Sequence, residues 1–281
     1  MKAPIVNPHA PQPTSPIAMI RSYWRHRQLI WQMSRREVMG RYRGSVMGIA
    51  WSFFNPVLML IVYTFVFSVV FKAKWGADTG ESKAQFAIIL FTGMIVHGFF
   101  SEVANRAPSL VLENVNYVKK VIFPIEILPA VAVFSALFHS LISISVLLFA
   151  FLVINGYVYW TVIFIPIVLL PILILTIGIS WILAALGVFL RDVSQTIGII
   201  TTVMMFLSPV FYPLSALPER FQEMLFINPL TFIIEQMRKV IVYGGKPDIV
   251  GECLYLTISI SVAWFGFAMF QKARKGFSDV L

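Results

Sequence analysis

The chain has 281 residues, of which 58% are hydrophobic and only 12% are charged, and its formal net charge is +9. A soluble domain of this length would carry about 25% charged residues and could not bury so much apolar surface. The composition excludes an ordinary soluble enzyme and a disordered chain, and it indicates an integral membrane protein. The single cysteine, Cys253, excludes an intramolecular disulfide and a cysteine-based zinc cluster.

The N-terminal region divides into two parts. Residues 1–16 contain five prolines, which predicts a flexible tail rather than a helix. In residues 17–43, arginines surround apolar side chains that recur at helical spacing: Ile20, Trp24, Trp31 and Val38. This pattern predicts a basic amphipathic helix on the inner membrane surface. The helix either serves only as an anchor in membrane lipid or also touches a cytoplasmic partner.

Runs without charged residues locate the membrane in residues 44–271. A spanning helix needs about 20 mainly apolar residues, and the longest run, 127–190, can hold two helices around the turn dipeptide Asn155-Gly156. The runs lack the alternation of membrane strands. We therefore predict an all-α membrane protein with six transmembrane helices, at about residues 45–71, 84–101, 127–153, 159–188, 195–216 and 251–270.

The distribution of lysine and arginine orients these spans. With the N-terminus inside, 15 of the 22 basic residues fall on the cytoplasmic side. Both termini are therefore predicted to be cytoplasmic, including a short tail at 272–281. Topology and attraction to anionic lipid account for the positive charge, so no nucleic-acid partner is predicted.

Two segments between the spans are more apolar than simple connectors. The cytoplasmic loop 102–120 has Pro108 to start a short helix and several leucines and valines, which favours a docking element over a solvated connector. The external segment 217–248 holds two amphipathic stretches separated by Asn228-Pro229, each too short to cross. They are predicted to re-enter around a cavity, with Glu235, Arg238 and Lys239 directed toward water; two helices resting on the outer leaflet are the alternative.

Prolines and histidines inside the predicted spans each admit two interpretations. Pro56 in the first span and Pro209 in the fifth either shape helix packing or act as hinges. His97 and His139 have no acidic neighbour within the spans, which favours packed neutral histidines over members of a proton relay.

Several kinds of chemistry are absent from the sequence. It contains no G-x-x-x-x-G-K-[ST] phosphate loop, H-E-x-x-H pair or G-x-S-x-G motif. We therefore expect no enzymatic activity, no ATP hydrolysis and no cofactor or metal site in this chain. Because no ionisable group is expected at mid-membrane, a transporter of this kind would receive its energy through its cytoplasmic face.

Three groups of motifs, in chain order, resemble one known family. The first group is 34–56, containing Arg41-Tyr42-Arg43-Gly44-Ser45 and Asn55-Pro56, and the second is 116–129. The third comprises Arg191-Asp192, 207–213 and Asn228-Pro229-Leu230-Thr231. Together they are similar to the membrane subunits of bacterial ABC transporters that export polysaccharides, namely O-antigen and teichoic-acid exporters. The likeness runs from about residue 25 to the C-terminus.

The resemblance implies a function and partners. Such permeases are homodimers in the bacterial inner membrane, each bound to a separate ATP-binding cassette ATPase that holds ATP and Mg. They form a channel for a polysaccharide linked to undecaprenyl diphosphate, which for this chain would be an O-antigen. The loop 102–120 would couple to the ATPase, and 217–248 would form the gate. A non-transporting membrane scaffold for glycan synthesis, and an ABC permease for drugs or small lipids, remain alternatives.

The same resemblance implies three sets of site residues. One set would couple to the ATPase: Arg35, Arg36, Glu37, Arg106, Ser109, Glu113 and Asn114. A second would form the gate: Asn228, Pro229, Ile233 and Met237. The third would line the channel with aromatic faces that stack on sugars without selecting one sequence of them: Trp51, Phe54, Tyr63, Phe211 and Tyr212.

Overall fold

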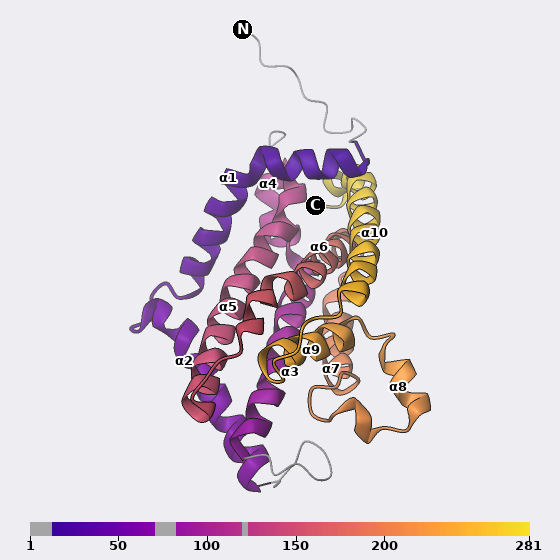
Figure 1. Cartoon of the computed structure of the whole chain (residues 1–281). Coiled ribbons are helices and arrows are strands. Elements are labelled where there is room, and N and C mark those ends of the chain that lie inside the picture. The colour runs from indigo at the N-terminus through magenta and orange to yellow at the C-terminus, as the bar shows by residue number, and fades with distance from the viewer. Residues whose placement is uncertain (1–12, 71–82, 120–122) are drawn as a thin grey trace.

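The computed structural model describes residues 13–70, 83–119 and 123–281, and every regular element in these residues is a helix. The helices form one bundle, with α1 and the C-terminus at the same end (Figure 1), here called the α1 end. Most of the predicted tail, residues 1–12, lies outside the described part of the chain. The α-helices are α1 (Pro16–Arg41), α2 (Trp51–Tyr63), α3 (Lys83–Arg106), α4 (Val115–Lys119), α5 (Leu128–Asn155), α6 (Ile165–Phe189), α7 (Val193–Phe206), α8 (Glu219–Leu225), α9 (Pro229–Ile241), α10 (Ile249–Ala273) and α11 (Phe277–Val280).

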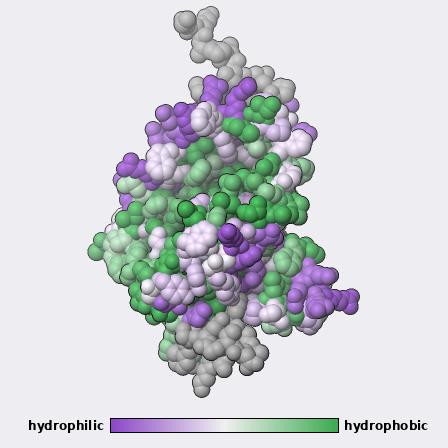
Figure 2. Space-filling view, in the orientation of Figure 1, coloured by the Kyte–Doolittle hydropathy of each residue, from purple (hydrophilic) through white to green (hydrophobic). Residues whose placement is uncertain are grey.

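Five helical segments among the described residues are long and apolar enough to cross a membrane: Gly48–Phe67, Ala84–Ser109, Ile125–Asn155, Trp160–Phe189 and Ile249–Gly276. They contain α2, α3, α5, α6 and α10, and α7 is a shorter apolar helix. Figure 2 shows hydrophobic residues in a broad band across this face, between hydrophilic residues at the α1 end and those of α8. The predicted all-α membrane fold is confirmed.

The fifth predicted span, 195–216, is too long. The helix α7 has 14 residues and ends at Phe206, because Pro209 follows two residues after the C-cap Leu207 and cannot continue the helix. The Tyr212 hydroxyl donates to the carbonyl of Phe206 at 3.0 Å and closes the turn. Pro209 therefore terminates α7 and does not kink it. A helix of this length covers about 21 Å, which is less than the thickness of the hydrocarbon core of a typical bilayer.

The helix α3 lies at the centre of the bundle and packs against α2, α5, α6, α7 and α9. In the apolar 18-residue stretch of its span 78% of the residues are buried, against 11% in the corresponding stretch of the span that contains α2. Buried His97 of α3 contacts the carbonyl oxygen of Thr201 in α7 through Nε2 at 3.0 Å, which is the packed arrangement. The helix continues beyond the predicted end at 101 to Arg106, so one continuous rod links both ends of the bundle.

The helices α6 and α10 pack very closely through small residues. A Cβ atom added to Gly178 would lie 2.7 Å from the Cα of Ala263, and one added to Gly266 would lie 2.2 Å from the carbonyl oxygen of Gly178. Small residues let the backbones of membrane helices approach and gain van der Waals contact. Near this crossing, the buried Trp181 donates from Nε1 to the carbonyl oxygen of Glu126 at 3.0 Å.

The helix α1 has two apolar faces. Ser15 caps its N-terminus by accepting from the amide of Ala18 at 3.2 Å, with Pro16 in the first turn. Its first half lies across the α1 end, and its second half runs beside α5 (Figure 1). One face is buried in the bundle: Ile30, Ser34 and Val38. The other is exposed: Ile17, Ile20, Trp24 and Trp31. The single predicted stripe is therefore wrong for Val38, because it lies on the buried face.

Candidate functional site

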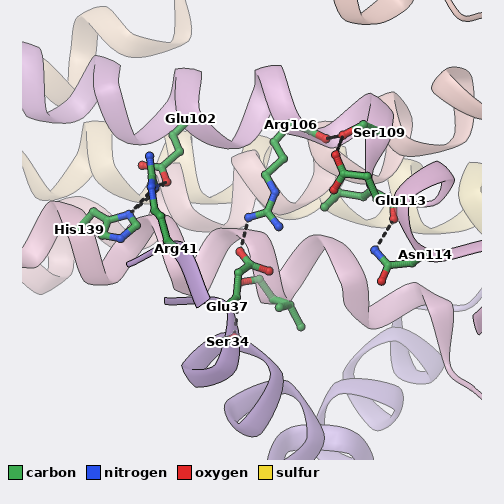
Figure 3. A network of polar contacts seen from close by, with 11 residues as sticks. Ser34, Glu37, Arg41, Glu102, Arg106, Ser109, Glu113, Asn114 and His139 are labelled. Carbon is green, nitrogen blue, oxygen red and sulfur yellow. Dashed lines mark hydrogen bonds and ion pairs between the residues drawn. The ribbon is translucent and has the colours of Figure 1, made fainter. Parts of the chain in front are cut away.

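Five of the residues predicted to couple to an ATPase lie together at the α1 end (Figure 3). Glu37 of α1 forms an ion pair with Arg106 at the end of α3. The Ser109 hydroxyl donates to Oε1 of Glu113 at 2.7 Å. The Asn114 side chain donates to the backbone carbonyl one turn earlier at 2.8 Å. We call Glu37, Arg106, Ser109, Glu113 and Asn114 the coupling cluster; it joins α1 to α3 and to the segment that follows α3.

The other two predicted coupling residues, Arg35 and Arg36, lie on α1 beside this cluster. Both are exposed, and Arg36 donates from Nη2 to the Tyr117 hydroxyl at 3.2 Å. A cavity of about 270 Å³ opens here, with Arg36, Glu37 and Glu113 among its lining residues. The α1 end therefore offers charged groups and a recess within one surface.

Tight backbone packing positions the loop after α3. Two 3₁₀ turns, Ala107–Ser109 and Leu112–Asn114, follow α3, and Pro108 is the second residue of the first, a position that suits its fixed φ. A Cβ atom added to Gly187 of α6 would lie 2.1 Å from the carbonyl oxygen of Pro108. Val111 is fully buried. The loop therefore packs against the bundle and is not a solvated connector along this part.

A second ion pair lies beside the first, and we did not predict it from the sequence. Arg41 of α1 pairs with Glu102 of α3 (Figure 3), and Nδ1 of His139 in α5 lies 3.1 Å from Oε1 of Glu102. The expectation that His139 has no acidic neighbour is therefore wrong, because Glu102 reaches it from another helix. The pKa of the nearby Tyr42 phenol is raised, chiefly because the phenol is partly buried. The charge of Glu102 also raises this pKa, whereas the charge of Arg41 lowers it.

The predicted gate residues lie at the N-cap of α9 and along the helix. Asn228 caps the helix by accepting from the amide of Leu230 at 3.0 Å, and Pro229 occupies its first turn. Ile233 and Met237 are fully buried in the apolar core of the same chain. In this structure these two side chains face the interior of the bundle, so their role in a gate stays a prediction.

Arg238 does not face water, contrary to the prediction from the sequence. Its side chain is fully buried, whereas Lys239 is exposed and Glu235 is partly exposed. Arg238 follows Ile234 by four residues, so it shares the buried side of α9. The guanidinium finds three acceptors there, which offset the cost of removing a charge from water. A charged group of α9 therefore packs directly against the span that contains α3.

The predicted channel aromatics lie on α2 and on the turn after α7. The ring centroid of Phe67 lies 5.8 Å from that of Phe211 and 6.5 Å from that of Tyr63, so Phe67 connects the two segments. Trp51 and Phe54 are more exposed and lie on α2. Tyr212, the last of the predicted channel aromatics, lies in the turn after α7, which its hydroxyl closes.

No group suited to a metal ion is present among the described residues, in which no three His, Cys, Asp or Glu side chains cluster. What the arrangement offers instead is a polar recess at one end and apolar helix surfaces along its length.

Comparison with known proteins identifies the family. The model of the family described as "ABC-2 type transporter" matches residues 28–242, which is most of the chain. This chain belongs to the ABC-2 type transporter family. The match includes α2, α3, α5, α6, α7 and α9, so the coupling cluster and Arg238 both lie inside the ABC-2 region.

Curated ABC-2 relatives align over nearly the whole chain. An O-antigen export system permease protein of Myxococcus xanthus is 27% identical over 94% of this chain and 99% of its own length. A protein of the same name from Klebsiella pneumoniae is 28% identical over 89% of this chain and 93% of its own. A polysialic acid transport protein of Escherichia coli is 22% identical over 84% and 90%.

The coupling cluster allows a charge-exchange test in this ABC-2 protein. Arg106→Glu should loosen the loop, because it would place a carboxylate opposite Glu37 and near Glu113. Adding Glu37→Arg should restore a pair of opposite charges and recover most of the loss. Hydrogen exchange of residues 107–114 measures this. Protection equal in the single and double variants would show that the pair does not hold the loop.

Proposed function

We propose that this chain is the channel-forming permease subunit of an ABC exporter that carries a lipid-linked polysaccharide out of the bacterial cytoplasm. The proposed substrate is an O-antigen attached to undecaprenyl diphosphate. The observation that carries the proposal is the alignment with an O-antigen export system permease protein over 94% of the chain. These relatives favour a polysaccharide over drugs or small lipids, and transport over a scaffold.

The proposed energy source is a separate ATPase subunit that binds ATP and Mg. The sequence has no phosphate loop of its own. The coupling cluster supports docking at the α1 end, because it is packed, charged and beside a cavity. Movements of the ATPase would reach the spans through the ion pair between Glu37 and Arg106 and through Gly187, which contacts the loop from α6.

The proposed assembly contains two copies of the chain in the inner membrane. Large apolar side chains are exposed on α2 and α7, including Phe53 and Ile199. Lipid or a second copy must cover such surfaces. Because Tyr63 is the last residue of α2 and Phe211 lies in the turn after α7, pairing through α2 and α7 would place aromatic rings near the junction of the two copies, where a polysaccharide could pass between them.

A reporter assay tests the proposed sidedness. A cytoplasmic reporter fused after Leu281 or before Met1 should be active, because basic residues favour the inner side and α1 lies at the same end as the C-terminus. A reporter inserted at Gly245 should read as external. An external reading at either terminus would contradict the proposed orientation.

Reconstitution tests the proposed function. The chain and its ATPase partner are placed in vesicles with a lipid-linked polysaccharide, and transfer is followed by an enzyme that digests the polymer on one side only. ATP-dependent transfer should require both subunits, and the chain alone should hydrolyse no ATP. Transfer that is unchanged without the ATPase, or hydrolysis by the chain alone, would contradict the proposal.

A further inference from the structure

The buried side chain of Arg238 connects three separate segments of the chain. Its Nε donates to the carbonyl oxygen of Ile89 in α3 at 3.2 Å, and its Nη2 donates to the carbonyl oxygen of Val210 after α7 at 3.1 Å. Its Nη1 donates to Oε1 of Glu235 in α9 itself at 2.8 Å. Because Arg238 has no exposed surface, these acceptors replace water around the charge.

The space for this guanidinium depends on a glycine in α3. A Cβ atom added to Gly93 would lie 3.1 Å from Nη2 of Arg238 and 3.3 Å from the Cα of Val210. These distances are shorter than ordinary van der Waals contact. The absence of a side chain at Gly93 therefore lets α9 and the turn after α7 approach α3 closely enough for Arg238 to reach both carbonyls.

Asn228 attaches α9 to the end of α7 at a second point. Its Nδ2 donates to Oγ of Ser208 at 2.8 Å and to the carbonyl oxygen of Leu207 at 3.2 Å. These bonds satisfy groups that the end of α7 leaves unpaired. Asn228 thus bonds the beginning of the turn 207–210 to α9, and Arg238 bonds the end of the same turn to α9.

The opposite end of α3 carries the coupling cluster. Ile89 and Arg106 are 17 residues apart in one continuous helix, which corresponds to about 26 Å. Separating α9 from α3 would leave a buried guanidinium without two of its acceptors, which is unfavourable. A force that moves α3 from the end that carries the coupling cluster should therefore move α9 and the end of α7 as well.

We propose that Arg238 is a positioning residue that fixes α9 and the end of α7 to α3, so that these three segments move as one rigid body during transport. The link to transport rests on the proposed function, whereas the rigid attachment does not. The gate would then open by displacement of this body relative to α2 of the same or the other copy, and α9 would not swing on its own.

Distance measurements test the rigid body directly. Nitroxide labels are attached at Gly98→Cys on α3 and Lys239→Cys on α9, both exposed, after Cys253→Ser. Labelled chain is diluted with unlabelled chain, assembled with the ATPase in vesicles and studied by pulsed electron resonance. With Arg238 intact, the distance should be the same without nucleotide and after trapping with ATP and vanadate. A change of that distance on trapping would overturn the proposal, whatever the variants show.

Variants test the part played by Arg238. Arg238→Lys keeps the charge but loses the forked geometry, so the distance distribution should broaden and polymer exported per ATP should fall about tenfold. Gly93→Ala should act in the same direction if Arg238→Lys does not fold. Arg220→Lys, on the exposed surface of α8, is the matched control.

The outcomes separate this proposal from the proposed function. If both Arg238→Lys and Gly93→Ala keep a narrow distance distribution and export as much polymer per ATP as the unmodified protein, the role proposed for Arg238 is overturned. A failure of the unmodified complex to export would contradict the proposed function alone, since the distance distributions of the nucleotide-free protein can still be compared. Melting temperatures are measured throughout, because a purely structural role would lower stability without changing the ratio of export to hydrolysis.

Discussion

Replacing Gly178 by alanine should destabilise the purified protein by about 1–3 kcal/mol, even though alanine is the better helix former. The new Cβ would lie 2.7 Å from the backbone of Ala263 in α10, and backbone atoms cannot rotate aside. The helices α6 and α10 would have to separate, which would also disturb the packing of Trp181 against Phe267. We expect Gly266→Ala to act similarly, since its Cβ would meet the carbonyl oxygen of Gly178.

Gly98→Ala is the matched control for this prediction. Gly98 is also in a membrane helix, but nothing lies within 4 Å of a Cβ added there. Alanine should therefore be neutral or stabilise α3 by up to about 1 kcal/mol. Thermal unfolding in detergent, followed by the loss of the monodisperse species, compares the variants. Equal melting temperatures for Gly178→Ala and Gly98→Ala would show that α6 and α10 are not closely packed.

Gly187→Ala should separate ATP hydrolysis from transport while leaving insertion into the membrane intact. Its Cβ would lie 2.1 Å from the carbonyl oxygen and 2.6 Å from the Cα of Pro108. The loop must move away from α6, and the coupling cluster moves with it. A displacement of about 1 Å at a site that must fit a partner is enough to disable it. We therefore expect weak co-purification of the ATPase and little export for each ATP hydrolysed.

Gly198→Ala in α7 is the matched control here. The nearest atom to its Cβ would be Oδ1 of Asn105 at 3.9 Å, an ordinary contact. Export and hydrolysis are measured for both variants in the same vesicles. If Gly187→Ala binds the ATPase and exports as well as Gly198→Ala does, the loop is not held against α6 in the way that the structure describes.

The sequence predicted the helices better than it predicted their ends. Hydrophobic runs are local properties, so the spans containing α2, α3, α5, α6 and α10 were found in order. The end of α7 was missed because the apolar run continues past Pro209, although the chain turns there. The burial of Arg238 was missed because Ile89 precedes it by 149 residues. Its spacing of four from Ile234 was the one local signal that it shares the apolar side.

The paired charges at the α1 end could have been predicted more fully. Glu37 and Arg41 are four residues apart on α1, and Glu102 and Arg106 are four apart on α3, so each pair lies on one helix face. The order of charges is the same on both helices, and each acid pairs with the base of the other helix. Only the approach of α1 to α3 could not be predicted from the sequence, because it depends on the tertiary fold.

The central position of α3 has a consequence for synthesis of the protein. Ribosomes make α3 early, but four of the helices around it, α5, α6, α7 and α9, follow it in the chain. Until they emerge, His97 and Glu102 lack the carbonyl and imidazole groups that contact them in the folded bundle. Because polar groups are costly in lipid, α3 cannot reach its final environment until residues as far as Ile241 have been made, so the bundle must be completed late in synthesis.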